Sequence, residues 1–80
     1  MFRIELSRRA ERNLQELDAA TMQRVVAAVR GITRNPFMGR NIKKLRGNLA
    51  GKYRLRIGRI RAVYIVIEDE NIIYVDDIDQ

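Results

Sequence analysis

The feature that most restricts the fold is a strict alternation of apolar and basic residues over residues 52–57. A period of two is typical of a half-buried β-strand, whose side chains point in turn to opposite faces. Gly58 and Arg59 follow, and a glycine in a two-residue connection is typical of a β-hairpin. Residues 60–67 are apolar on both faces apart from Arg61, as expected of a central strand. The sequence therefore predicts an antiparallel hairpin that turns at Gly58.

Two further strands are expected. Residues 68–71 are polar and predict a second turn, after which residues 72–78 form the last strand of a three-stranded meander. Near the start of the chain, residues 2–6 alternate in the same way and predict a separate strand.

A pair of helices is expected between the first strand and the meander. Ser7 is a good N-cap for a helix through Leu17, and Asp18 can cap a second helix that Pro36 ends. The apolar stripe of this second helix consists of Met22, Val25, Val29 and Ile32. Residues 35–51 are rich in glycine and basic residues and predict a long, partly irregular connection.

This order of elements predicts an α+β fold. An N-terminal strand and a three-stranded antiparallel meander would form one antiparallel sheet, with both helices of an α-helical hairpin packed on the same face of it. We expect residues 1–80 to form a single domain. A chain this short buries only ~60% of its unfolded surface, so a bound partner would help to stabilise it.

The charges are strongly segregated along the chain. Residues 1–18 hold four basic and four acidic side chains, residues 19–67 hold twelve basic and none acidic, and residues 68–80 hold six acidic and none basic. A long segment without any carboxylate indicates an anionic partner, and phosphate backbones are the commonest one. The simpler alternative is a basic face that is merely solvated.

Missing residue types exclude several kinds of chemistry. The chain has no cysteine and no histidine, which excludes disulfides, thiolate metal sites and imidazole catalysis. No stretch offers the ~20 apolar residues that a membrane helix needs. We therefore expect a protein of the reducing cytoplasm with no cofactor and no membrane partner.

The hairpin register places like charges opposite each other. Counting outward from Gly58 pairs Arg56 with Arg61, and such opposition destabilises a sheet by up to ~1 kcal/mol unless an anion or a carboxylate lies between the two. One sheet face would then carry Lys52, Arg54, Arg56 and Arg61, and the apolar face would bury the helices. The structural alternative is that Asp76, on the basic face, neutralises Arg61 in an ion pair.

A face of guanidinium groups suits RNA cleavage. Attack by the ribose 2′-hydroxyl on the adjacent phosphate builds negative charge that fixed guanidiniums stabilise. Proton transfer would need a tyrosine, a desolvated lysine or a carboxylate, and we expect Tyr53 and Tyr64 to face the core and Tyr74 the basic face. A competing hypothesis is a Mg²⁺-dependent nuclease. Its ligands would come from Glu68, Asp69, Glu70, Asp76, Asp77 and Asp79.

Three motifs resemble the core signature of the RelE/ParE toxin superfamily over essentially the whole chain. They are Lys44-Leu45-Arg46-Gly47, Tyr53-Arg54-Leu55-Arg56-Ile57-Gly58 and Arg61-Ala62-Val63-Tyr64. Resemblance to the RelE branch implies a toxin that cleaves mRNA on the ribosome and is neutralised by a RelB-like antitoxin in a hetero-oligomer. It implies catalytic roles for Arg54, Arg56 and Arg61. It also implies that RNA is bound by Lys43, Lys44, Arg46 and Lys52.

Two departures from the family pattern affect this expectation. Arginine stands at Arg54 and Arg56 where some members have lysine, and an arginine can hardly act as a general base. The family also continues past the last strand with a basic residue and a tyrosine implicated in cleavage, whereas this sequence stops at Gln80. We therefore expect weak or absent cleavage by the chain as given.

Two other functions remain open. A ParE-like toxin would share the fold but poison DNA gyrase by binding instead of cutting RNA. A passive RNA-binding module would need aromatic stacking platforms, and the chain has only three tyrosines and two phenylalanines.

Overall fold

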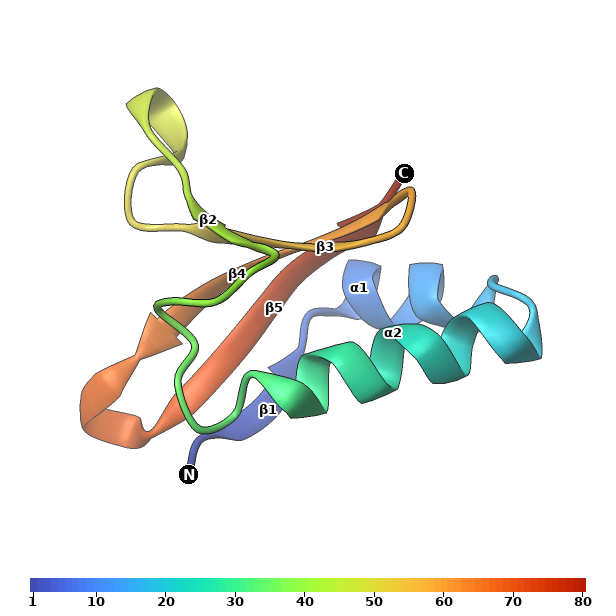
Figure 1. Cartoon of the computed structure of the whole chain (residues 1–80), viewed down its shortest axis with the longest axis horizontal. Helices are drawn as coiled ribbons and strands as arrows, with labels where there is room; N and C mark the ends of the chain where they lie inside the picture. Colours follow the sequence, from blue (N-terminus) through green and yellow to red (C-terminus); the bar gives the residue numbers. More distant parts are fainter.

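The computed structural model describes residues 1–80 as two helices that cover one face of a five-stranded sheet (Figure 1). The elements in chain order are β1 (Arg3–Leu6), α1 (Arg8–Gln15), α2 (Ala19–Gly31), β2 (Ile42–Lys44), β3 (Tyr53–Ile57), β4 (Ile60–Ile67) and β5 (Ile72–Asp79). Short 3₁₀ turns occupy Gly47–Leu49 and Glu68–Glu70. The predicted α+β class and the packing of both helices on one face are confirmed.

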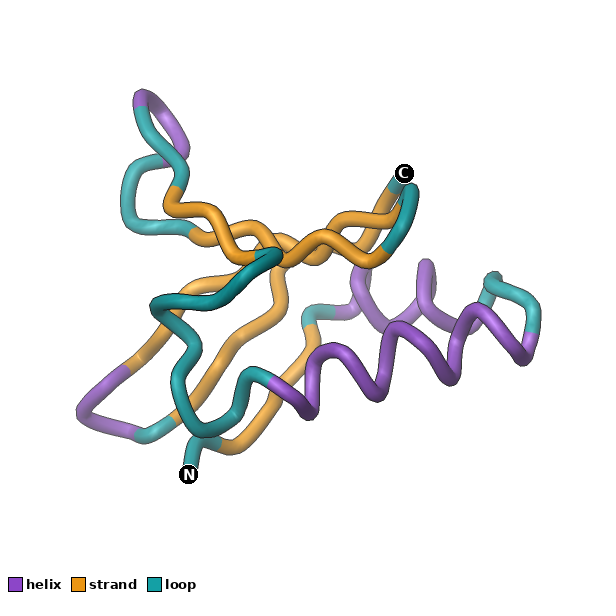
Figure 2. The backbone as a smooth tube through the Cα atoms, viewed as in Figure 1, coloured by secondary structure: helices purple, strands orange, loops and turns teal.

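The sheet is not wholly antiparallel, and here the sequence-based prediction was wrong. The strand order is β1-β5-β4-β3-β2, and β1 lies parallel to β5 at one edge. Figure 2 shows the strands in orange and the helical pair in purple on one side of them. A parallel neighbour needs a long crossover, which the helical pair and the following strands provide. The other edge is β2, a short strand within the connection that was predicted to be partly irregular.

Both predicted N-caps are confirmed. The Ser7 hydroxyl accepts a hydrogen bond from the Ala10 amide at 3.0 Å, and the Asp18 carboxylate accepts one from the Thr21 amide at 3.2 Å. These bonds satisfy amides in the first turn that have no partner within the helix. Hydrogen bonding from the side chain and the backbone amide of Thr21 holds the pKa of Asp18 below its ordinary value. Neither helix is long and apolar enough to cross a membrane.

The core lies between the helices and the inner face of the sheet. Val25 and Val29 of α2 are buried against it, as the apolar stripe predicted. Tyr64 is fully buried, and its hydroxyl donates a hydrogen bond to the carbonyl of Pro36 at 2.7 Å. This bond fixes the connection after α2 to the centre of the sheet. Burial raises the pKa of Tyr64 well above its usual range.

Candidate nucleic-acid interface

The β3–β4 hairpin has the predicted register. Arg56 lies opposite Arg61, and Gly58 adopts a left-handed φ of 60°, which two-residue hairpin turns favour. Lys43 of β2 lies opposite Arg54 of β3, which adds a second pair of like charges across neighbouring strands. Each such pair is unfavourable for the sheet unless a carboxylate or another anion lies beside it.

A β-bulge at Val63 and Tyr64 changes the pairing of β5. Next to the turn, Ile67 pairs with Ile72, whereas on the other side of the bulge Arg61 lies opposite Asp79. The predicted ion pair between Asp76 and Arg61 is therefore wrong, because the extra residue in β5 shifts the register. Arg61 instead contacts Asp79, with its Nη2 3.2 Å from the carboxylate.

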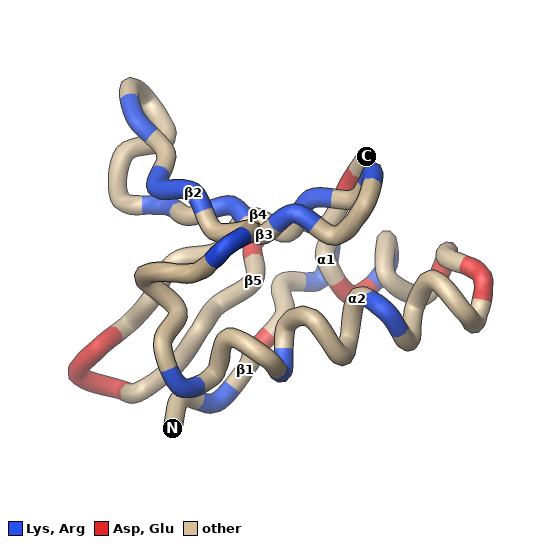
Figure 3. The backbone as a smooth tube through the Cα atoms, viewed as in Figure 1, with Lys and Arg blue, Asp and Glu red and all other residues tan.

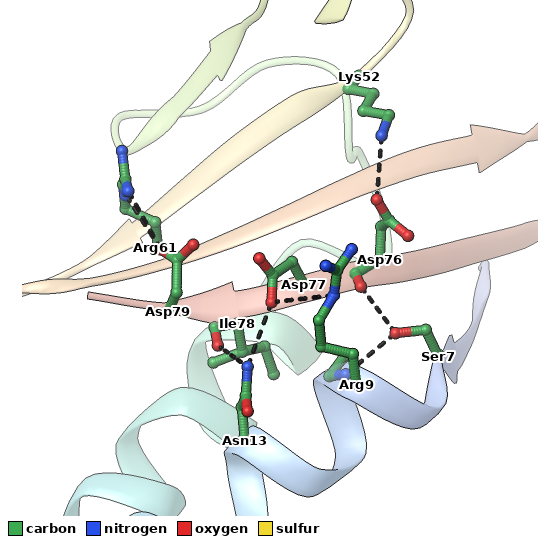
Figure 4. Close-up of polar contacts among 10 residues, drawn as sticks. Ser7, Arg9, Asn13, Lys52, Arg61, Asp76, Asp77, Ile78 and Asp79 are labelled. Carbon is green, nitrogen blue, oxygen red and sulfur yellow. Dashed lines mark hydrogen bonds and ion pairs between the residues drawn. The ribbon is translucent and has the colours of Figure 1, made fainter.

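Ser7 holds the bulged strand in place. Its hydroxyl donates a 2.7 Å hydrogen bond to the carbonyl of Asp76, while the same oxygen caps α1 (Figure 4). Further along α1, the Asn13 amide donates to the carbonyl of Ile78 at 2.9 Å and to the Asp77 carboxylate at 3.3 Å. One face of α1 is thus tied to the end of β5.

Next to this region the outer face has a hollow of about 350 Å³, here called the basic hollow. The ten residues that line it are Arg9, Leu45, Leu49, Lys52, Arg54, Arg61, Val63, Asp76, Asp77 and Asp79. Basic residues are spread over β2, β3 and their connection (Figure 3). The acidic residues of the turn between β4 and β5, Glu68–Glu70, lie at another corner of the molecule. Four cations and three carboxylates therefore meet in one concave surface.

Arg54 differs from the other cations of the hollow. Lys52 contacts Asp76 at 3.0 Å and Arg61 contacts Asp79 at 3.2 Å, but Arg54 makes no ion pair within 4.0 Å. Its Nε is buried without a hydrogen-bond partner. An unpaired buried donor is unfavourable, and five guanidinium donors match the oxygens of a phosphate. Arg54 is thus the side chain best placed to receive an anion.

The structure divides the predicted site residues into three groups. Lys52, Arg54 and Arg61 line the basic hollow together. Arg56 is exposed and lines a different hollow of about 660 Å³ between α2 and β3. A third group, consisting of Lys43, Lys44 and Arg46, lies along β2 and the residues after it.

Arg9 was missed by the sequence-based reasoning. It lies in the first turn of α1, and its Nε is 3.7 Å from the carboxylate of Asp77 across the basic hollow. No local pattern marks it, because Asp77, whose carboxylate it approaches, lies near the other end of the sequence. Only the contact between α1 and the end of β5 brings it to the site.

The tyrosines and carboxylates are the side chains that were considered for proton transfer or metal binding, and none of the tyrosines lines the basic hollow. Tyr53 stacks on Tyr64 with ring centroids 5.7 Å apart on the core side, as predicted. Tyr74 lies opposite Ile65. No three acidic side chains lie close enough together to hold a metal ion. The acidic side chains near the end of β5 contact Lys52, Arg9 and Arg61 instead.

Comparison with known proteins places this fold among small bacterial and archaeal toxins. The toxin–antitoxin complex RelBE2 of Mycobacterium tuberculosis contains a similar chain, with a TM-score of 0.87 and 25% identity over 99% of this chain and 96% of that one. The heterotetrameric YoeB–YefM complex of Staphylococcus aureus gives a TM-score of 0.81 and 27% identity over 100% and 97% of the two chains. The RelE1 protein of Methanocaldococcus jannaschii, described as a candidate toxin, is 29% identical over 76 residues, covering 92% of this chain and 83% of that protein.

The sequence itself matches the model of one family. Residues 4–80 match the ParE toxin of the type II toxin–antitoxin system parDE. The chain therefore belongs to this toxin family, within the RelE/ParE superfamily that its motifs resemble.

Proposed function

We propose that the chain is a metal-independent endoribonuclease toxin that cuts mRNA on the ribosome. The observation that carries this proposal is Arg54, a cation of a concave basic surface that has no carboxylate partner and has a buried, unpaired Nε. The Lys43–Arg54 pair of like charges adds support, since neither residue makes an ion pair within the chain and an RNA backbone would relieve their repulsion. A protein that acts on ribosomes works in the cytoplasm.

The reaction needs stabilisation of a negative charge. The ribose 2′-hydroxyl loses its proton as its oxygen bonds to the adjacent phosphorus. The bond from phosphorus to the 5′-oxygen breaks, that oxygen takes up a proton, and a 2′,3′-cyclic phosphate and a 5′-hydroxyl are left. Arg54 and Arg61 would donate hydrogen bonds to the phosphoryl oxygens as charge builds on them. Arg56 lines another hollow but lies opposite Arg61 on the hairpin, and from there its positive charge would assist them. Removing one such donor commonly costs about 10²–10³ in rate.

RNA binding would extend beyond the basic hollow. Lys52 lies within it, and Lys43, Lys44 and Arg46 extend the positive surface along the β2 edge. Contacts of this kind to phosphates hold the strand in register without reading its sequence. We assign these four residues to binding of mRNA or the ribosomal RNA backbone.

An antitoxin would neutralise the toxin. The relatives in the M. tuberculosis and S. aureus complexes are bound to antitoxins, which supports a RelB-like partner and a hetero-oligomer for this chain. An acidic antitoxin segment would compete with RNA for the same cations. Addition of such a partner should therefore abolish cleavage.

The test is cleavage of mRNA on purified ribosomes by the wild type, Arg61→Ala and Arg59→Ala. Arg59 lies in the hairpin turn outside the basic hollow. Arg59→Ala therefore removes the same charge as Arg61→Ala but leaves the hollow unchanged. The wild-type rate is expected to be low, and relative to it Arg61→Ala should be slower by about 10²–10³, whereas Arg59→Ala should stay near the wild type. Measurable cleavage at equal rates by the wild type and Arg61→Ala would contradict the proposal.

A second candidate is a toxin that inhibits DNA gyrase by binding, and the match to the ParE family model favours it. The two functions differ in their first effect on a cell. Expression of a ribonuclease arrests translation, whereas gyrase poisoning produces DNA damage. Loss of supercoiling by purified gyrase in the presence of the chain, with mRNA intact on ribosomes, would favour this second function.

A further inference from the structure

The three carboxylates near the end of β5 each contact a different cation of the basic hollow. Asp76 contacts Lys52 at 3.0 Å, and Asp79 contacts Arg61 at 3.2 Å. Asp77 contacts Arg9 at the longer distance of 3.7 Å (Figure 4). Acidic oxygens thus lie beside three of the four cations of the hollow.

The Arg9–Asp77 pair is the one most easily exchanged. The Arg9 side chain is 62% exposed, compared with 32% for Lys52 and 48% for Arg61. Asp77 is held independently, because it also accepts a hydrogen bond from Asn13. An exposed ion pair at this distance adds little stability, so Arg9 can leave Asp77 at small cost.

We propose that Arg9 is a further binding residue for the RNA backbone, and that Asp77 holds its guanidinium until a phosphate takes its place. The inference rests on the proposed function, since it concerns the same RNA-binding surface. A phosphate in the basic hollow would offer Arg9 a bidentate partner that also lies within reach of Arg54. Asp77, left without its cation, would stay bonded to Asn13.

This arrangement makes opposite predictions for the two members of the pair. Loss of Arg9 removes a phosphate contact and weakens RNA binding. Loss of the charge on Asp77 removes a competitor of the phosphate and strengthens binding. If the pair only joined α1 to β5, both changes would reduce stability and neither would affect RNA binding beyond the change in net charge.

The experiment measures binding of a fluorescein-labelled oligouridylate to the purified chain by anisotropy over a range of salt concentrations. Arg9→Ala is compared with Arg12→Ala, an exposed arginine of the same helix that does not line the basic hollow. We expect Arg9→Ala to bind about three- to fivefold more weakly than Arg12→Ala. Its slope of log affinity against log salt should also fall by about 0.7, the value for one phosphate contact on a single strand.

The second comparison is Asp77→Asn against Asp69→Asn. Asparagine keeps an oxygen for Asn13, and Asp69 lies in the turn before β5 away from the hollow. We expect Asp77→Asn to bind RNA about two- to fivefold more tightly than Asp69→Asn. Thermal unfolding is measured on all four variants as the control that each of them is folded.

The outcomes separate the inference from the function on which it rests. If the wild type binds RNA and Arg54→Ala weakens binding, but Arg9→Ala equals Arg12→Ala or Asp77→Asn equals Asp69→Asn, this inference alone is overturned. If the wild type shows no salt-dependent binding, the proposed function is overturned together with the inference.

Discussion

The two faces of the sheet follow different rules. On the inner face, apolar side chains such as Ile73 and Tyr64 are fully buried, and the one hydroxyl among them has a partner. On the outer face, Arg54 has an unpaired buried donor, and cations oppose each other across the strands. The inner face is thus arranged for stability, whereas the outer face carries the charged groups to which the proposed function assigns the binding of an external anion.

The bulge in β5 keeps the two faces distinct. Strict alternation from Val75 would turn Asp77 toward the core and Ile78 toward solvent. The extra residue reverses this, so that Ile78 is 2% exposed and Asp77 lies on the outer face. One irregularity therefore completes the core and supplies the carboxylates that contact the outer cations.

The largest effect is expected from a cavity on the inner face. Ile73→Ala should lower the free energy of unfolding by about 2–5 kcal/mol, because Ile73 is fully buried in the core. Ile65→Ala is the matched control on the outer face of β4 and should cost markedly less. Urea denaturation measures both, and equal losses would break the contrast between the faces.

A smaller loss is expected when the buried hydroxyl is removed. Tyr64→Phe leaves the carbonyl of Pro36 without its hydrogen bond and should cost about 1–3 kcal/mol. Tyr74→Phe, on the outer face opposite Ile65, should change stability little. The two variants are compared by thermal and urea unfolding, and a Tyr64→Phe variant as stable as the wild type would refute the role of this bond.

Alkaline pH tests the same tyrosine without a structural change. Burial raises the pKa of Tyr64 in the folded chain, so above its ordinary value of 10.0 the unfolded chain loses this proton first. Stability from the neutral phenol is present below that pH and is lost as the pH rises further. Between pH 9 and about pH 11 the wild type should therefore lose more stability than Tyr64→Phe, and parallel losses would argue against a buried neutral phenol.

The smallest effect is expected for an ion pair of the outer face. Lys52→Met removes the contact with Asp76. Both side chains of this ion pair are about one-third exposed, so its loss should change the free energy of unfolding by at most ~1 kcal/mol. Lys44→Met, at the exposed sheet edge, is the control. A loss above ~2 kcal/mol for Lys52→Met alone would mean that this pair serves the fold and not ligand binding.

Local sequence patterns predicted much of the fold and part of the site. The register of the first hairpin depends only on the turn at Gly58 and on alternation, so it could be counted from the sequence. The caps at Ser7 and Asp18 are likewise local. The caps predicted where the two helices begin, and the hairpin register predicted that Arg56 lies opposite Arg61.

Features that depend on distant contacts could not be predicted. The bulge in β5 involves Ser7, which lies 69 residues from its partner Asp76. The parallel pairing of β1 and the three-residue strand β2 also depend on the assembled sheet. For the same reason, no local pattern indicated that Arg9 would line the basic hollow or that Arg56 would line another one.

The most direct test measures stability and cleavage on one variant, Arg54→Met. We expect the free energy of unfolding to stay the same or to rise by up to ~1 kcal/mol, because the repulsion from Lys43 is removed. Cleavage of mRNA on ribosomes should fall by about 10²-fold or more. A variant that loses stability while it keeps the cleavage rate of the wild type would contradict the claim that the outer face serves an external anion.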